Sequence, residues 1–449
     1  MPSAPESGPP GRMRRRALAV LALNLLGFAL TILVFCPGIM TLDARYMYTD
    51  IGKKFLGDWQ SPAMTVLWAL IDPLAPGPAS MFSLTAALYW LAFTLIGLTL
   101  ARYSAVALAL PFLALSPPAF LLVGIIWRDV LFAAVWLLAA ALVFDLDTRK
   151  LVARTVQGLA IALIMFGVLL RPNAAPAAPL LAAYVLWPAH WSLKRALLSY
   201  LPALVVFVAL VPLVYYVLLG ATRQHPLHGL FVFDLGGISH FAGENQFPLQ
   251  WTAREHELLV SGCYQPDKWD IYWYIEPCRF VMQRLEGEKI FGTPAMLAAW
   301  GRAVLKHPGA YARHRAAFMT NFLTGTNLVM WTQDVERPEQ PAFADRATVQ
   351  TLLAIEARLR PTWLFKPATW LVLCAALCAL AWRRRASPIG AFIIGLCGSA
   401  AVYVATYAVV GVASDYRYGY FAALAGIVGS VALVSALAGG RWHAQRGAT

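Results

Sequence analysis

The sequence contains few charged residues. Asp, Glu, Lys and Arg make up 13% of its 449 residues, whereas soluble domains carry about 25%. With 59% hydrophobic residues, the composition excludes an ordinary soluble protein. Many apolar stretches reach about 18 residues or more, which is enough to cross a hydrocarbon core of about 30 Å. The chain is therefore expected to be embedded in a membrane.

The sequence also lacks the short segments of alternating polar and apolar residues that a membrane β-barrel requires. Inside lipid, each backbone amide must find its partner within its own segment, so the apolar stretches are expected to be helices. No internal repeat is visible. The predicted fold class is an all-α polytopic membrane protein with interfacial helices in its first outer loop and a mixed outer domain between helices seven and eight.

About ten transmembrane helices are expected. With the N-terminus placed in the cytoplasm, every short inner loop carries Lys or Arg, as the positive-inside rule requires. The net charge of +13 then reflects topology and not a nucleic-acid partner. The predicted location is a bacterial inner membrane. The expected helices lie near residues 17–35, 80–101, 104–123, 128–145, 156–170, 174–189, 197–219, 364–382, 388–411 and 418–438.

The first apolar stretch, 17–35, follows the basic residues Arg12, Arg14, Arg15 and Arg16. A cleaved signal peptide is the alternative, but its apolar region spans only about 7–15 residues and precedes a small-residue cleavage site. We favour an uncleaved first helix.

These helices divide the chain into five parts. The segment from 220 to 363 is near neutral in charge, and long translocated loops do not follow the positive-inside rule. The predicted parts are a disordered cytoplasmic N-terminus (1–16), an N-terminal membrane module (17–219) whose first outer loop (36–79) is catalytic, a non-cytoplasmic domain (220–363), a C-terminal membrane module (364–438) and a cytoplasmic tail (439–449).

Cysteine and histidine give limited signals. Cys263 and Cys278 fall in the predicted outer domain, 15 positions apart, and in an oxidising compartment they would form a disulfide. Two free thiols are the alternative. The histidines show no convincing ligand spacing and are interpreted as ordinary loop residues. No metal ligand is predicted, although a divalent metal remains possible as a cofactor.

Polar residues near the predicted helix ends gather on one face of the membrane. Because they all lie on the outer side, an active site is expected to face outward. The candidates are Asp43, Asp50 and Asp58 in the first outer loop, Arg128 and Asp129 before the fourth helix, Arg171 and Asn173 after the fifth, and Arg417 and Tyr418 before the tenth.

Each candidate has a structural alternative. Asp129 at a helix N-terminus and Arg171 at a helix C-terminus both complement the helix dipole. Arg417 lies near a helix N-terminus, where a cation is disfavoured. Asp415 could neutralise it, and so could a bound phosphate. Asp43 lies close to the membrane surface, where a carboxylate can act as a general base, or it is simply a solvated loop residue.

Taken in order, these short motifs resemble the GT-C class of membrane glycosyltransferases, which includes protein O-mannosyltransferases and lipid A aminoarabinose transferases. The resemblance covers most of the membrane portion and only weakly the outer domain. One departure is Gln60-Ser61-Pro62, where many relatives carry His-Pro. The motifs are Pro37-Gly38-Ile39-Met40-Thr41-Leu42-Asp43, Asp58-Trp59-Gln60-Ser61-Pro62, Arg128-Asp129, Arg171-Pro172-Asn173 and Arg417-Tyr418.

The resemblance implies a reaction and roles. A sugar would pass from a polyprenyl-phosphate carrier to a lipid, polysaccharide or protein acceptor. Asp43 would be the base on the acceptor, and Asp129 would position the acceptor or a metal. Arg171 and Arg417, with Arg128, would hold the donor phosphate.

Other functions remain open. A transporter or flippase for a lipid-linked or anionic substrate is the main alternative, although ion-coupled transporters usually carry ionisable residues at mid-membrane, and none is seen there. A different outer-face enzyme, such as an O-antigen ligase or polymerase, and an assembly factor are further alternatives.

Overall fold

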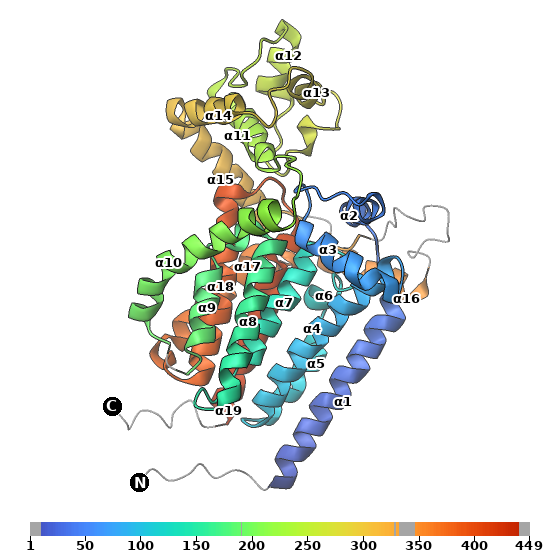
Figure 1. The fold of residues 1–449 in the computed structure, drawn as a ribbon, viewed down its shortest axis with the longest axis vertical. Coiled ribbons are helices and arrows are strands. Elements are labelled where there is room, and N and C mark those ends of the chain that lie inside the picture. The colour runs from blue at the N-terminus through green and yellow to red at the C-terminus, as the bar shows by residue number, and fades with distance from the viewer. Residues whose placement is uncertain (1–9, 190, 327–328, 332–345, 440–449) are drawn as a thin grey trace.

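The computed structural model describes residues 10–189, 191–326, 329–331 and 346–439. Throughout these ranges the chain forms helices and connecting loops without a β-strand, and only isolated bridges occur. Figure 1 shows a bundle of long helices with a separate helical cluster at one end.

Six helices in the described part are long and apolar enough to cross a membrane, which confirms a helical membrane protein. They are Gly11–Phe35 in α1, Pro78–Ala101 (α4), Leu151–Leu170 (α8), Leu193–Leu218 (α10, Leu193–Pro212, with a π-helical extension), Pro388–Val410 (α18) and Tyr416–Ala438, which includes α19 (Tyr420–Ala438).

Three further expected spans coincide with shorter helices. These are α7 (Arg128–Leu142), α9 (Ala178–Leu186) and α17 (Pro367–Ala381). α7 lies in the centre of the bundle, and its Phe132 and Trp136 rings pack against Phe421 of α19 at centroid distances of 5.4 Å. In contrast, α10 is mostly exposed on the flank, where lipid would cover it (Figure 1).

The stretch 104–123 is not one helix, in contrast to the expectation. It forms a 3-10 turn (Ala105–Ala109), α5 (Leu110–Ala114) and α6 (Pro117–Phe120). Pro117 and Pro118 cannot donate backbone hydrogen bonds to a preceding turn, so the helix cannot continue through them. Hydropathy alone does not register this interruption.

The N-terminal boundary also differs from the prediction. α1 begins at Pro10, so residues 10–16 are helical and not part of a disordered segment; residues 1–9 of that segment lie outside the described residues. The tail predicted for 439–449 lies outside them from residue 440 onward. The described ends of α1 and α19 lie at the end of the bundle opposite the helical cluster (Figure 1).

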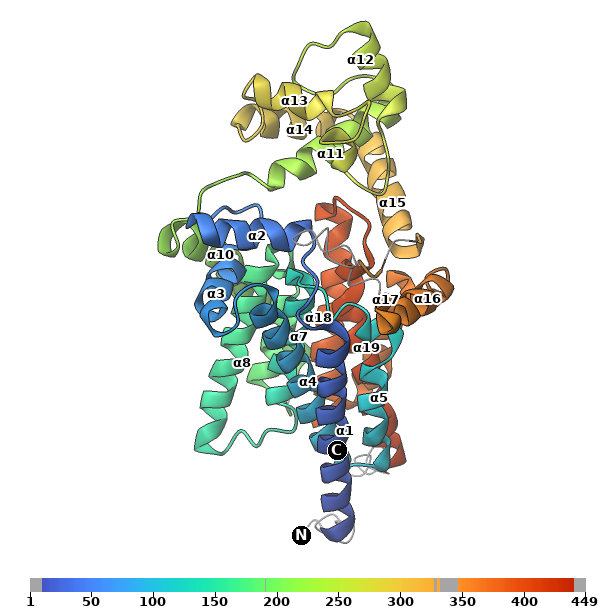
Figure 2. The same cartoon turned by 90° about the vertical axis from the view of Figure 1, so that its right-hand side faces the viewer.

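The first outer loop contains α2 (Leu42–Lys53) and α3 (Pro62–Ile71). Both lie across the end of the bundle nearest the helical cluster, and α2 runs crosswise in both views (Figures 1 and 2). Ser61 caps α3 by accepting a hydrogen bond from the Met64 amide, and its hydroxyl donates to the Leu169 carbonyl at 2.8 Å. The loop is thereby fixed to the end of α8.

The sequence predicted a mixed outer domain. In its described residues the domain contains helices and no strands, so this prediction is wrong. A disulfide joins Cys263 to Cys278. The prediction of this bond is therefore confirmed. The helices are α11 (Leu227–Ala242), α12 (Ala253–Glu257), α13 (Phe280–Gly287), α14 (Pro294–Lys306), α15 (Pro308–Thr324) and α16 (Ala347–Leu359).

A buried polar network joins α11 to α15. Asp234 is fully buried, accepts a hydrogen bond from Trp300 Nε1 at 2.7 Å and forms an ion pair with Arg315, and His314 Nε2 lies 3.1 Å from its Oδ1. Burial lowers the pKa of His314 more than the neighbouring Asp234 raises it, which favours a neutral imidazole. Arg315 is therefore the cation that balances the charge of Asp234. The interpretation of the histidines as ordinary loop residues is wrong for four of them, which lie inside helices: His228 and His240 in α11, His256 in α12 and His314 in α15.

The outer domain is attached to the bundle through the segment that follows α18. Arg315 donates to the Gly411 carbonyl at 2.6 Å. A Cβ added at Gly411 would lie 2.3 Å from the Phe318 ring, so the close contact with α15 requires glycine. Further along, the Trp269 amide donates to the Val412 carbonyl at 2.9 Å, and the Ser414 amide donates to the Asp267 carbonyl at 2.6 Å.

Removing the disulfide should loosen this attachment. A loop of about 15 residues closed by a disulfide contributes about 3 kcal/mol, so replacing both Cys263 and Cys278 by Ser should lower the apparent melting temperature of the purified chain. Differential scanning fluorimetry measures this. The exposed Cys36 provides the control variant, C36S. An unchanged melting temperature in the double variant would contradict the structural role of the bond.

Candidate functional site

Charged side chains from four distant parts of the chain meet at the end of the bundle nearest the helical cluster. They come from the start of α2 (Asp43), the start of α7 (Arg128 and Asp129), the end of α8 (Arg171) and the turn before α19 (Arg417). Five of the residues predicted from the sequence therefore belong to one cluster.

Asp129 and Arg171 form its innermost pair. Arg171 Nε donates to Asp129 Oδ1 at 2.7 Å, and Arg171 Nη2 contacts the same oxygen. The side chains are only 3% and 9% exposed. Each charge also complements the dipole of its own helix. Asp129 is thus occupied in holding Arg171, and we assign it a structural role instead of the catalytic one expected.

Asp43 and Arg417 form an outer pair. Arg417 Nη1 donates to Asp43 Oδ2 at 2.7 Å, and Gln60 Nε2 donates to Asp43 Oδ1 at 3.1 Å. Arg417 Nε also lies 3.2 Å from Asp415 Oδ2. Arg417 therefore has two carboxylate neighbours. If its contact with Asp43 were displaced, Asp415 would still balance its charge.

Aromatic rings connect the two pairs. The Arg417 guanidinium lies 4.5 Å from the centroid of the Trp127 ring, and Trp127 Nε1 donates to Thr41 Oγ1 at 2.8 Å. Tyr418 is a neighbour of both cations, with its ring centroid 4.8 Å from Arg171 and 5.1 Å from Arg417. Such cation–π contacts fix the planes of the guanidinium groups. Asn173, also predicted, is a neighbour of the Tyr403 hydroxyl, on which Arg171 and Asp129 also act.

Arg128 differs from the other two arginines. It forms no ion pair or hydrogen bond with any residue in the described part of the chain. The residue is only partly exposed, and its charge lies within the electrostatic reach of Arg171, Asp129 and Asp43. The two carboxylates act on Arg128 without a direct contact, so an incoming anion would meet a cation that has no partner to displace. This arrangement is typical of an anion-binding site.

Electrostatics keep Asp43 ionised. Burial raises the pKa of its carboxyl, but the charges of Arg417, Arg128 and Arg171 outweigh this, and the net pKa lies below the ordinary value. The side chain is nevertheless 37% exposed, more than that of Arg417 at 17%. Asp43 is thus a carboxylate that a molecule from the outer side can reach.

Two predicted candidates do not join the cluster. Asp58 is buried, and it accepts hydrogen bonds from Tyr216 at 2.7 Å and from the Gln224 amide at 2.5 Å. It ties the first outer loop to the segment after α10. Asp50 lies two turns along α2 from Asp43, about 10 Å away at 1.5 Å per residue, and burial raises the pKa of its carboxyl.

The sequence suggested that aromatic residues of the outer domain select the acceptor, but it did not predict the contact of this domain with the charged cluster. Residues 267–269 pair with residues 412–414, only a few positions before Arg417. The charges of Asp43 and Arg417 act on Asp270. No local spacing could reveal this contact, because the two segments are far apart in the chain. The aromatic residues around Trp269 were its only visible signal.

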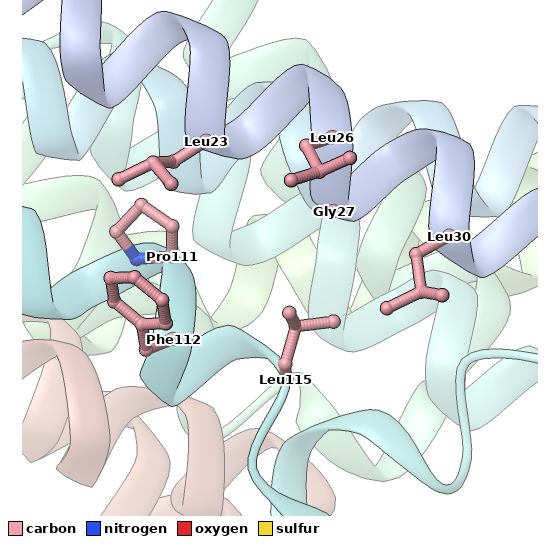
Figure 3. Close-up of a pocket in the computed structure, with 7 residues that line it drawn as sticks. All are labelled: Leu23, Leu26, Gly27, Leu30, Pro111, Phe112 and Leu115. Carbon is pink, nitrogen blue, oxygen red and sulfur yellow. The ribbon is translucent and has the colours of Figure 1, made fainter.

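A small cavity lies elsewhere, between α1 and α5. Its volume is about 80 Å³, and its walls are entirely apolar (Figure 3). It offers no group that could bind a charged or sugar-like molecule, and its residues, which include Leu26, Leu30 and Phe112, are exposed on the flank that faces lipid. The cavity is therefore separate from the charged cluster in both position and chemistry.

Comparisons with protein-family models, curated proteins and solved structures find no match for this chain. Among the described residues, no group of three or more His, Cys, Asp or Glu side chains is placed to hold a metal ion.

Variants of the neighbouring residues Asp129 and Arg128 should have opposite effects on stability. Asp129→Ala strands the buried Arg171 charge, which typically costs about 3–5 kcal/mol, so the melting temperature should fall. Arg128→Ala removes an unpaired cation next to Arg171, so the melting temperature should stay the same or rise. Thermal unfolding in detergent measures both. A large loss of stability in Arg128→Ala would show that Arg128 has a structural partner.

Proposed function

We propose that this protein is a membrane glycosyltransferase that moves a sugar from a polyprenyl-phosphate carrier to an acceptor on the non-cytoplasmic face. The observation that carries the proposal is the unpaired Arg128 beside the Asp43–Arg417 pair. A phosphate needs cations that are free to bind it, and a transfer to a hydroxyl needs a reachable carboxylate. The cluster offers both within one site.

The double coordination of Arg417 suggests how the donor would enter. A donor phosphate that binds Arg128 and Arg417 would displace Asp43, while Asp415 would remain beside Arg417. The phosphate would also neutralise the cations that depress the pKa of Asp43. Asp43 would therefore become a stronger base once the donor is bound.

The transfer then needs only one base and two cations from the protein. The acceptor hydroxyl oxygen attacks C1 of the sugar, and the bond between C1 and the phosphate oxygen breaks. Asp43 takes the hydroxyl proton and later returns it to water. The polyprenyl phosphate leaves with its negative charge held by Arg128 and Arg417. Alignment and charge stabilisation supply most of the acceleration in such a reaction.

The placement in the membrane follows the same proposal. The basic loops that follow α4, α7, α9 and α17 lie at the end of the bundle opposite the cluster (Figure 1). If these loops face the cytoplasm of a bacterial inner membrane, the cluster faces the exterior. The shorter helices α7, α9 and α17 would then complete the membrane crossing together with the segment 105–120, giving about ten passes.

Donor binding and turnover should separate in two variants. Arg128→Ala should weaken binding of a polyprenyl-phosphate sugar at least about tenfold, because a charge-assisted hydrogen bond is lost. Asp43→Asn should bind the donor but lose turnover about 10²–10⁴-fold. Native mass spectrometry of the full chain measures binding, and release of polyprenyl phosphate measures turnover.

Matched controls sharpen this test. Asp50→Asn changes a carboxylate on the same helix, α2, and Arg383→Ala removes a cation at the opposite end of the bundle; both should keep binding and turnover. Native donor affinity in Arg128→Ala, or native turnover in Asp43→Asn, would refute the roles assigned to these two residues. If the native chain bound a lipid-linked sugar without any turnover and moved it between leaflets of vesicles, a flippase would replace the transferase.

The pH dependence should reveal the state of Asp43. A carboxyl whose pKa is lowered stays ionised as the pH falls, so kcat/KM should show no acidic limb down to about pH 4–5, where ordinary Asp and Glu titrate. In Arg417→Gln, Asp43 loses one of the cations that lower its pKa, so that pKa should rise. The acidic limb of kcat/KM should therefore move to higher pH. Steady-state rates against pH measure this. Identical limbs in both proteins would exclude Asp43 as the base.

A further inference from the structure

The loop enclosed by the disulfide carries aromatic side chains to the charged cluster. Residues 264–277 lie between Cys263 and Cys278. The backbone pairing of Asp267 and Trp269 with the segment 412–414 places this loop directly before Arg417. The loop is therefore held at both ends and along its centre, which leaves its side chains in a fixed position.

Four rings from this loop and the first outer loop pack into one continuous cluster, which we call the aromatic platform: Trp59, Trp269, Trp273 and Tyr274. Trp59 lies 4.7 Å from Trp273 and 5.9 Å from Trp269 between ring centroids. Tyr274 stacks on Trp273 at 5.3 Å with 19° between the ring planes. Trp59 directly precedes Gln60, which binds Asp43.

Tyr274 is the exposed member of the platform, whereas Trp269 is buried. Tyr274 is 55% exposed, although stacked aromatic rings normally gain from burial. Its hydroxyl is a neighbour of the Asp270 carboxylate, and the charges of Asp270 and Asp43 both act on it. Asp270 itself is partly buried, and burial raises the pKa of its carboxyl despite Lys268 nearby. A flat exposed ring, a carboxylate and a lysine thus lie together beside the reachable Asp43.

This combination matches the surface chemistry of a sugar. One face of a sugar ring presents C–H groups with a slight positive charge, which suit the negative face of an aromatic ring. Its edge carries hydroxyls, which donate to a carboxylate and accept from an ammonium group.

We propose that the aromatic platform is an acceptor site for a saccharide, whose ring stacks on Tyr274 and whose edge hydroxyls meet Asp270 and Lys268. This inference rests on the proposed transferase function, because it identifies the acceptor as a carbohydrate.

The exposure of the side chains favours the acceptor over the donor sugar. Tyr274 is 55% exposed, Asp43 37% and Arg171 9%. Exposure thus decreases from Tyr274 through Asp43 to Arg171, so the platform lies on the solvent side of the base and Arg171 lies deeper in the bundle. A lipid-phosphate donor reaches the arginines from the membrane, whereas a molecule on the platform arrives from outside and places its hydroxyl next to Asp43.

The test is saturation-transfer NMR on the full chain in a zwitterionic detergent, since detergents with sugar headgroups would compete. The probes are a panel of methyl glycosides of common hexoses and pentoses. At least one should receive saturation on the protons of its ring face. Tyr274→Ala should weaken its binding about fivefold, as expected for the loss of one stacked ring. Tyr274→Phe should retain most of the binding.

Trp363→Ala, which removes another exposed ring (65%), is the matched control and should bind as the native chain does. Absence of binding for every glycoside, or equal binding in Tyr274→Ala, would overturn the proposal. Competition between the glycoside and a polyprenyl-phosphate sugar would overturn the assignment to the acceptor.

The two proposals fail separately. Loss of donor binding concerns Arg128 and leaves glycoside binding unchanged. If the donor bound in an Arg128-dependent manner and no glycoside bound, the transferase would stand with an acceptor that is not a saccharide.

Discussion

The ion pair between Asp129 and Arg171 is the interaction on which the outer end of the bundle depends. Both charges are nearly removed from solvent, so each needs the other to compensate for lost hydration. The pair joins the start of α7 to the end of α8. It also fixes the guanidinium that stacks on Tyr418, and Tyr418 in turn contacts Arg417. The position of the reachable carboxylate, Asp43, thus follows from a buried pair beneath it.

A second constraint comes from outside the bundle. The turn that carries Asp415 and Arg417 is held by Arg315 at Gly411 and by the backbone of Asp267 and Trp269. The buried Asp234 network fixes Arg315. The outer domain therefore does more than cover the membrane portion, because it determines where the last cation of the cluster stands. A loosened domain would shift the site even if every helix in the membrane stayed in place.

The sequence predicted the membrane class and most of the cluster, and the reasons are physical. Low charge and long apolar runs are strong signals, and polar residues at the ends of apolar helices are few enough to stand out. Asp43, Arg128, Arg171 and Arg417 were found in this way. The interruption at Pro117 was missed because a hydropathy average depends on apolar character alone. It does not detect that proline lacks the amide hydrogen a continuous helix needs.

Contacts that depend on the packing of distant segments were beyond prediction. Asp129 was predicted to be catalytic because its ion pair with Arg171 was unknown. The two residues lie 42 positions apart, and the sequence gives no sign that they meet. Asp58 was a candidate for the same reason, although Tyr216 and Gln224 occupy its carboxylate. His314 was interpreted as a loop residue because the outer domain shows no strong periodicity. The contact of residues 267–269 with residues 412–414 arises only once the helices have assembled.

The distance along the chain between Asp43 and Arg417, 374 residues, has a consequence for biosynthesis. The carboxylate emerges with the first helix, and its cation emerges with the last one. A nascent chain that is still being inserted holds Asp43 without Arg417, and the same is true of any fragment truncated before α19. The cluster is therefore complete only after the chain has been made and inserted as far as Arg417, so shorter products in the membrane lack its Asp43–Arg417 pair.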